Sequence, residues 1–475
     1  MAILFKNTSS NKCWYVLVLV IILMPSYFIH SQKYPDWGDD FAQYIYQSQQ
    51  IHSPSQKYKE VLNVEGYSSS KRSLFFSVLL SIVQPSTDIQ SYVSVISVMY
   101  IFAAICCFIF LSSQFSLVVS FVTTLCVFYN FLVLRLKSEV VPEFLYIALF
   151  LLILYCAFQT KKWISYIIPV LIALLISIRF IGLEMLLAYI VYLFFQKDVP
   201  LKNKIKSSII SVVITAAVCL LINMCFLNSV NNHEVSLYGS FVLANVNFQT
   251  VIDNIMIYSK YITLFFEQEI PFWMNTIITI SVCLFFVIGF LYALIKNRTM
   301  IEFAFVFYFL FLFVFPYNGD TIRYLIPIVP VFMYYIVFGL HLILSRIKFR
   351  WNTQLIIVGL LIVLFSNSKT IWLAINHNNT NVNPYDLSVL NDFEIVKQKV
   401  KSSETIAFGK PFIINLLVDR DAYFLSQKNY NQVFLKANYV LVAKPFVSEL
   451  YPKIKDIPIS KGDTTELTNF YLIKL

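Results

Sequence analysis

Long runs of apolar residues, separated by short polar segments, fill the first three quarters of the chain. A run of about 18 or more apolar residues is long enough to cross the hydrocarbon core of a bilayer as a helix. The pattern predicts about eleven spans, at residues 14–29, 89–111, 114–133, 140–158, 163–178, 181–196, 207–227, 274–295, 300–316, 322–345 and 353–373. Residues 163–195 are predicted as two short spans, and one broken span is the alternative. The chain is therefore predicted to be a polytopic α-helical membrane protein.

The pattern changes at about residue 376. Short apolar runs typical of strands then alternate with helix-like stretches, the runs at 405–408, 439–442 and 470–473 and the stretches near 392–401, 412–418 and 447–453. Such alternation predicts a small α/β domain. The chain is thus divided into a membrane domain, residues 1–375, with outer loops at 31–72 and 228–272, and a C-terminal soluble domain, residues 376–475.

Composition agrees with this division and excludes one class of partner. Only 13% of the 475 residues are charged, and the mean hydropathy is +0.71; a soluble protein averages about 25% charged residues. The net charge of +10 would fit a nucleic-acid binder, but the basic residues gather in alternate loops, at positions 161–162, 197–206, 296–298 and 346–350. The positive-inside rule places these loops and the N-terminus in the cytoplasm. The loops 31–72 and 228–272 and the C-terminal domain are then extracytoplasmic.

The first outer loop concentrates negative charge beside the bilayer. Asp36, Asp39 and Asp40 fall within five residues, directly after the first span. Pro35 and Gly38 indicate a turn, and Asp39 is predicted to cap a helix. Apolar and small residues then recur at helical spacing, at Phe41, Tyr44, Ile45, Ser48 and Ile51. We expect a short amphipathic helix on the membrane surface with an acidic start; a loop with a solvated cap is the alternative.

Further ionisable residues gather at the outer ends of the predicted spans. These groups are Lys71 with Arg72; Arg135 and Lys137 with Glu139 and Glu143; Arg179 with Glu184; and Asp320 with Arg323. Charged groups at membrane depth are costly and commonly mark function. Snorkelling side chains or local ion pairs are the alternative for any one group. All of these groups, however, share the side of the membrane predicted for the acidic loop.

One reaction uses both sets of charges. When a sugar leaves a polyprenyl phosphate, negative charge develops on phosphate oxygens, and Arg and Lys side chains stabilise it. The attacking hydroxyl must lose its proton, for which a carboxylate is a suitable general base. The lipid tail stays in the bilayer, so this chemistry requires a site at the membrane surface between spans.

Several segments resemble one known family. Residues 38–45 (GDDFAQYI), after a first span, are similar to the first outer loop of GT-C superfamily glycosyltransferases, in particular the protein mannosyltransferase and aminoarabinose transferase group. Residues 137–144 (KSEVVPEF), 177–183 (SIRFIGL) and 320–330 (DTIRYLIPIVP) resemble later elements of that family, in the same order. Lys410-Pro411 and Asp419-Arg420 resemble parts of its outer domain. The chain departs from the family at 67–74 (YSSSKRSL), where Pro-Pro-Leu or a histidine is common.

The resemblance implies a GT-C-like fold and an inverting hexosyl- or pentosyltransferase in a bacterial plasma (inner) membrane. The donor would be a polyprenyl-phosphate sugar, and the acceptor a lipid, a glycan or a protein. Asp39 would be the general base, and Asp40 would support it or help to bind a metal. The implied substrate-binding residues are Asp36, Lys71, Arg72, Lys137, Glu139, Arg179, Arg323 and Tyr324. No cofactor is indicated, and the departure at 67–74 leaves use of a divalent metal open.

Two other functions share the many spans and charged residues. A transporter or flippase of lipid-linked sugars is the principal alternative; it would favour internal repeats and Gly- or Pro-broken spans, whereas the chain shows no repeat and has ten glycines. An O-antigen polymerase or ligase would favour Arg and His in a late outer loop. The loop 228–272 contains only His233 and no arginine.

Overall fold

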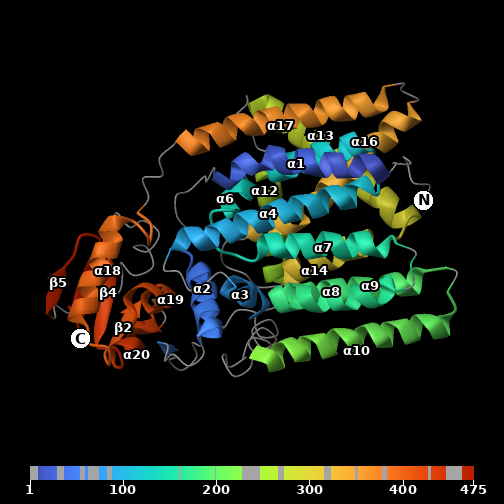
Figure 1. Cartoon of the computed structure of the whole chain (residues 1–475). Coiled ribbons are helices and arrows are strands. Elements are labelled where there is room, and N and C mark those ends of the chain that lie inside the picture. The colour runs from blue at the N-terminus through green and yellow to red at the C-terminus, as the bar shows by residue number, and fades with distance from the viewer. Residues whose placement is uncertain are drawn as a thin grey trace.

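The computed structural model describes residues 9–28, 37–53, 59–62, 74–82, 88–159, 161, 163–197, 199–226, 247–265, 272–314, 322–347, 351–376, 382–425, 429–444 and 463–475. Within these ranges the chain forms a bundle of apolar helices with a small α/β sheet domain at one end (Figure 1). The protein is therefore a polytopic α-helical membrane protein, as predicted.

Eleven apolar helices in the described part of the chain correspond to the eleven predicted spans. They are α1 (Ser9–Phe28), α4 (Ile89–Ser112), α5 (Leu117–Phe128), α7 (Glu143–Ala157), α8 (Ile164–Ile178), α9 (Leu183–Phe195), α10 (Leu201–Phe226), α13 (Phe272–Lys296), α14 (Met300–Val314), α16 (Val329–Arg346) and α17 (Asn352–Asn376). Five of them are long and apolar enough to cross a membrane. The other six, α8 and α9 among them, have apolar stretches of 10–17 residues.

The segment 163–195 is two helices, not one broken helix. The chain turns at Arg179 and the short helix η1 (Phe180–Gly182) between α8 and α9. Ile164 at the start of α8 and Leu193 near the end of α9 line one cavity, so the two helices run in opposite directions. A Cβ atom at Gly182 would lie 2.8 Å from the backbone of Leu175 and Ile176, so the tight reversal requires glycine there.

Short helices cover the end of the bundle that faces the sheet domain. They are α2 (Asp39–His52), α3 (Leu74–Ser81), α6 (Phe131–Leu136), α12 (Phe248–Leu264) and α15 (Ile322–Leu325), which continues through η2 (Ile326–Ile328) into α16. The predicted helix after the acidic loop is confirmed as α2, but Gly38 rather than Asp39 is its N-cap. The prediction that α2 lies on the membrane surface with an exposed polar face is wrong, because the polar residues Gln43 and Gln47 are buried, as Phe41 is. The sheet domain packs on α2 through α19 (Pro411–Ile413), while the Ser77 hydroxyl of α3 donates to the Gln47 side-chain oxygen at 3.0 Å.

The C-terminal sheet has the strand order β1-β3-β2-β4-β6-β5. Its strands are β1 (Val61–Leu62), β2 (Thr405–Phe408), β3 (Asp421–Phe424), β4 (Tyr439–Ala443), β5 (Thr464–Glu466) and β6 (Phe470–Lys474). The first four are parallel, and β4, β6 and β5 are antiparallel neighbours. The helices are α18 (Leu387–Lys399), α19, the π-helix η3 (Ile414–Val418) and α20 (Tyr430–Phe434). The three predicted strands are confirmed as β2, β4 and β6, and the predicted stretch 447–453 lies outside the described residues.

Helices α13 and α16 approach each other closely at Gly289 and Gly339. A Cβ atom at Gly339 would lie 1.9 Å from the carbonyl oxygen of Phe285 and 2.9 Å from the amide nitrogen of Gly289. Small residues at such crossings let two membrane helices pack backbone against backbone. The glycine pair therefore sets the distance between the two helices.

We expect Gly339→Ala to destabilise the protein by about 1–3 kcal/mol, because the added methyl group overpacks this crossing. Gly359→Ala is the matched control, since nothing lies within 4 Å of a Cβ at that position of α17. Thermal unfolding in detergent micelles measures both variants. An unfolding midpoint of Gly339→Ala equal to that of Gly359→Ala would contradict the close packing.

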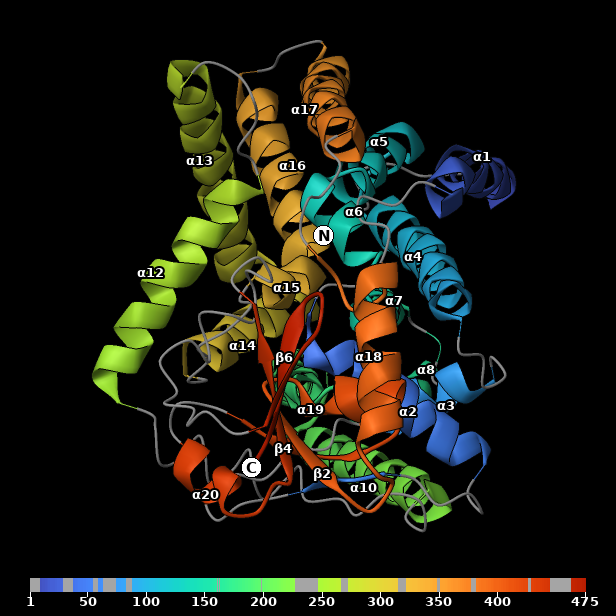
Figure 2. The ribbon, with the colours of Figure 1, turned by 90° about the vertical axis from the view of Figure 1, so that its left-hand side faces the viewer.

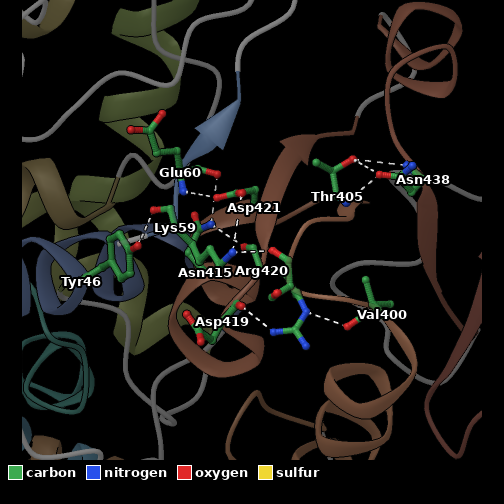
Figure 3. Close-up of polar contacts among 11 residues, drawn as sticks. Tyr46, Lys59, Glu60, Val400, Thr405, Asn415, Asp419, Arg420, Asp421 and Asn438 are labelled. Atoms are coloured by element: carbon green, nitrogen blue, oxygen red, sulfur yellow. Dashed lines mark hydrogen bonds and ion pairs between the residues drawn. The ribbon is translucent and has the colours of Figure 1, made fainter. Parts of the chain in front are cut away.

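A strand from the first outer loop joins the C-terminal sheet (Figure 3). Val61 and Leu62 of β1 pair in parallel with Ala422 and Tyr423 of β3. The Asp421 carboxylate accepts a hydrogen bond of 2.7 Å from the Glu60 amide and lies 3.8 Å from the Lys59 ammonium. The Tyr46 hydroxyl of α2 donates to the carbonyl oxygen of Lys59. The loop that carries α2 is thereby fastened to the sheet domain.

Asp421→Asn is expected to weaken the pairing of β1 with the sheet, because it removes the ion pair with Lys59 and weakens the hydrogen bond to Glu60. The free energy that holds β1 on the sheet should fall by about 1–2 kcal/mol. Amide hydrogen exchange should speed up at Glu60 and Ala422, whose amides bond across this edge. Asp419→Asn is the control, because asparagine tolerates the positive φ of 57° at that position. Unchanged exchange in Asp421→Asn would mean that the carboxylate does not hold β1.

Candidate functional site

Four charged side chains from distant parts of the sequence meet at the end of the bundle beneath the sheet domain. The Arg179 guanidinium, at the turn after α8, donates to Glu143 Oε1 at 2.6 Å. Arg323 Nε of α15 lies 3.3 Å from the same oxygen, and Arg323 Nη2 donates to the Asp40 carboxylate of α2. We refer to Asp40, Arg323, Glu143 and Arg179 as the charge cluster. Its charges alternate in sign and sum to zero.

Glu143 is the centre of the charge cluster and is fully buried. It is the first residue of α7, where the positive end of the helix dipole favours a carboxylate. A buried carboxylate is costly unless it is paired and hydrogen-bonded, and the two guanidinium groups supply that pairing. Its second oxygen, Oε2, is buried without a hydrogen-bond partner among the described residues. The site therefore keeps an acceptor to which a substrate hydroxyl or a water can donate.

Tyr324 fixes the two arginines from one side. The Arg179 guanidinium carbon lies 4.4 Å from the centre of the Tyr324 ring, and that of Arg323 lies 5.5 Å from it. The Tyr308 hydroxyl of α14 donates to the Tyr324 carbonyl oxygen at 2.6 Å. An aromatic face beside a cation stabilises the cation and limits its movement. Both guanidinium groups are thus held in place within the helix bundle.

The sheet domain covers the charge cluster through the residues before α2. The indole nitrogen of Trp37 donates to the Val382 carbonyl oxygen at 2.6 Å. The Trp37 ring lies edge-on to Phe408 and Phe470, with ring centres 6.4 and 6.0 Å apart. Figure 2 views this end of the molecule, where the strands and α18 lie in front of the helices. Trp37 therefore fixes the start of α2 against the sheet domain.

The structure brings together only some of the predicted site residues. Asp40, Arg179, Arg323 and Tyr324 belong to one site. Lys137 is buried after α6 and donates to the Ser26 carbonyl oxygen, and burial lowers the pKa of its ammonium to about 8. Glu139 is half-buried in the segment before α7. Asp36, Lys71 and Arg72 lie outside the described residues; Asp39 begins α2, and its side chain is likewise outside them.

The sequence reasoning missed the central role of Glu143 and the anchor Trp37. Glu143 belongs to one of the predicted charged groups, but Lys137 and Glu139 are the members of that group predicted to bind substrate. Arg179 was grouped with the nearby Glu184, but it forms an ion pair with Glu143, while Glu184 accepts a 3.4 Å hydrogen bond from Tyr146. The signal that would have found Glu143 is its place directly after Pro142, at the start of an apolar helix. No group of three or more His, Cys, Asp or Glu side chains in the described part of the chain is placed to hold a metal ion.

Comparisons with known proteins agree on the fold. No protein-family model and no curated protein sequence matches the chain. Among solved structures, it is similar to ArnT from Cupriavidus metallidurans bound to undecaprenyl phosphate, with TM-score 0.54, 9% identity, and 98% of both chains covered. It is also similar to the oligosaccharyltransferase AglB from Archaeoglobus fulgidus, solved with an inhibitory peptide and a dolichol-phosphate. That similarity has TM-score 0.56 and 10% identity, and covers 92% of this chain and 70% of AglB.

These likenesses identify the fold as that of the GT-C membrane glycosyltransferases, to which ArnT and AglB belong. The similarity to ArnT extends over the membrane helices and the C-terminal domain, since nearly the whole of each chain is covered. At about 10% identity the likeness shows the architecture only. The chemistry must therefore be argued from the residues of the site.

Proposed function

We propose that the protein is a membrane glycosyltransferase that moves a sugar from a polyprenyl phosphate to an acceptor hydroxyl on the outer face of the membrane. The observation that carries this proposal is the charge cluster, in which two guanidinium groups and two carboxylates meet under the sheet domain of a GT-C fold. A polyprenyl-phosphate sugar requires cations for its phosphate and a carboxylate for the acceptor proton. The cluster and the adjoining start of α2 offer both kinds of group.

Arg179 and Arg323 are the proposed phosphate partners. A guanidinium group has five N–H donors in a planar fork that fits phosphate oxygens. Negative charge grows on those oxygens as the bond from phosphate oxygen to the anomeric carbon breaks. Cations held in advance stabilise that charge without reorganisation. The lipid phosphates present in the ArnT and AglB structures support a lipid phosphate as the donor here.

Asp39 is the proposed general base, because it opens α2 next to Asp40, whose carboxylate contacts Arg323. It would take the proton of the acceptor hydroxyl as that oxygen attacks the anomeric carbon opposite the departing phosphate, which inverts the configuration. Asp40 would keep Arg323 in position. Lys71, Arg72 and Asp36 belong to the same outer loop and remain proposed substrate-binding residues, together with Lys137, Glu139 and Tyr324.

The proposed orientation places the charge cluster and the C-terminal domain outside a bacterial plasma membrane. Glu143 begins α7, and Lys161 follows the other end of that helix. The 15 residues of α7 make it about 22 Å long, so the two residues lie at opposite ends of the bundle. The basic loops thus lie at the end of the bundle opposite to the site. The positive-inside rule assigns that basic end to the cytoplasm.

The proposal is tested with a panel of radiolabelled polyprenyl-phosphate monosaccharides incubated with purified protein in membranes. We expect transfer of label from one donor to an acceptor in the membrane fraction, and none with Arg323→Met. Movement of labelled lipid between leaflets, without transfer from any donor, would instead establish a flippase and contradict the proposal.

A further inference from the structure

A polar cavity lies at the opposite end of the bundle from the charge cluster. Its volume is about 1030 Å³, and it is bounded by the end of α7, the start of α8, the end of α9, the start of α10 and the residues before α14. Gln159 and Lys161 line it after α7, and Gln196 lines it after α9. The cavity is separated from the proposed catalytic site by the length of α7. It therefore plays no part in the reaction proposed above.

One face of α10 lines this cavity and is mostly polar. Asn203, Lys206, Ser207, Ile210 and Ser211 line it, and their spacing of three and four residues places them on a single helical stripe. Three of the five are uncharged polar residues and one is a lysine, although α10 is otherwise apolar enough to span a membrane. Polar groups on a membrane helix are costly and commonly mark a binding function. The stripe therefore indicates a ligand with polar groups.

The charged residues that line the cavity indicate that its ligand is an anion. Lys161 and Lys206 are the charged residues among its described lining residues. The nearby Glu302 is fully buried and accepts hydrogen bonds from the backbone and the hydroxyl of Thr299. Lys204 instead donates to the Phe194 carbonyl oxygen at 2.8 Å, at the end of α9. The two lysines thus give the cavity a net positive field.

The lining of the cavity changes from the loop end inward, which favours a lipid over a small soluble anion as the ligand. Lys161, Gln196 and Lys206 lie at the loop end, whereas Ile168, Tyr189 and Ile210 lie one to two helical turns farther into the bundle. A polar, basic mouth above an inner wall to which Ile168, Ile210 and the Tyr189 ring contribute apolar surface matches a phosphate headgroup with the start of its acyl chains. Basic pockets between membrane helices bind such headgroups. We propose that this cavity is a binding site for an anionic glycerophospholipid from the leaflet at the basic end.

The test measures lipid binding to the full-length protein in detergent micelles by native mass spectrometry. Dioleoyl phosphatidylglycerol is the anionic probe and dioleoyl phosphatidylcholine the zwitterionic one. We expect the anionic lipid to bind more tightly, and Lys161→Gln/Lys206→Gln to weaken it about 25-fold, since each lysine contributes about fivefold. Ser207→Phe, which narrows the cavity and keeps both lysines, should weaken binding as well.

Lys202→Gln/Lys296→Gln is the matched control, because both of these exposed lysines lie at the same end but outside the cavity lining. It removes the same charge and should leave binding within about twofold of wild type. An equal loss in the control pair would show general attraction to the basic end and overturn the proposal. Full displacement of the lipid by glycerol 3-phosphate at millimolar concentration would assign the cavity to a soluble phosphate instead.

Discussion

Sugar transfer by Asp39→Asn is expected to fall by about 10²- to 10⁴-fold, the usual contribution of a general base. The amide is nearly the same size as the carboxylate but does not accept the proton of the attacking hydroxyl. The substitution should lower kcat and leave the KM for the lipid donor close to that of wild type, since the group acts only in the transition state. Initial rates over a range of donor concentrations separate the two constants.

Asp40→Asn is the informative comparison, because the Asp40 carboxylate contacts Arg323. Loss of that contact should disturb the phosphate site and raise the KM for the donor, with a smaller fall in kcat. Wild-type transfer by Asp39→Asn would refute its role as base and reassign that role to Asp40 or Asp36. If Asp39→Asn is active in this assay and Arg323→Met is not, the protein is still a glycosyltransferase, and only the assignment of the base is refuted.

The membrane part of the fold was predictable because its signal is local. A span is encoded by about 20 consecutive apolar residues, and each helix satisfies its own backbone hydrogen bonds. The same holds for the strands β2, β4 and β6, which are short apolar runs between helices. In the segment 163–195, for which one or two spans were possible, Gly182 marks the turn between two helices. Its close approach to the backbone of Leu175 and Ile176 shows why glycine is required there.

The site was predictable only in part, because its contacts join residues far apart in sequence. Arg323 contacts Asp40 across 283 positions, and the Trp37 indole bonds to Val382 across 345. The dipeptide Val61-Leu62 is too short to be recognised as a strand and becomes one only through pairing with β3. Likewise, α2 was expected to expose a polar face to water, but that face is buried, and Gln47 on it accepts a hydrogen bond from Ser77 of α3. Long-range packing decided each of these features.

Glu143→Gln is expected to cost about 3–5 kcal/mol of stability, the usual effect of removing one partner of a buried ion pair. The side chain keeps its shape, but Arg179 and Arg323 lose the charge that Glu143 Oε1 offers at 2.6 and 3.3 Å. The two guanidinium groups would then lie close together without the carboxylate that both of them contact. The free energy of unfolding in mixed detergent micelles measures the loss.

Glu184→Gln is the matched control for that prediction. Glu184 is also a buried glutamate in the first turn of a helix, but it accepts a hydrogen bond of 3.4 Å from a neutral hydroxyl, that of Tyr146. An amide accepts the same hydrogen bond, so the substitution should cost less than about 1.5 kcal/mol. If the charge cluster acts as a unit, Arg179→Met should recover part of the stability lost in Glu143→Gln, because it removes one of the two facing cations. Additive losses in the double variant would instead mean that Glu143 and Arg179 do not stabilise each other.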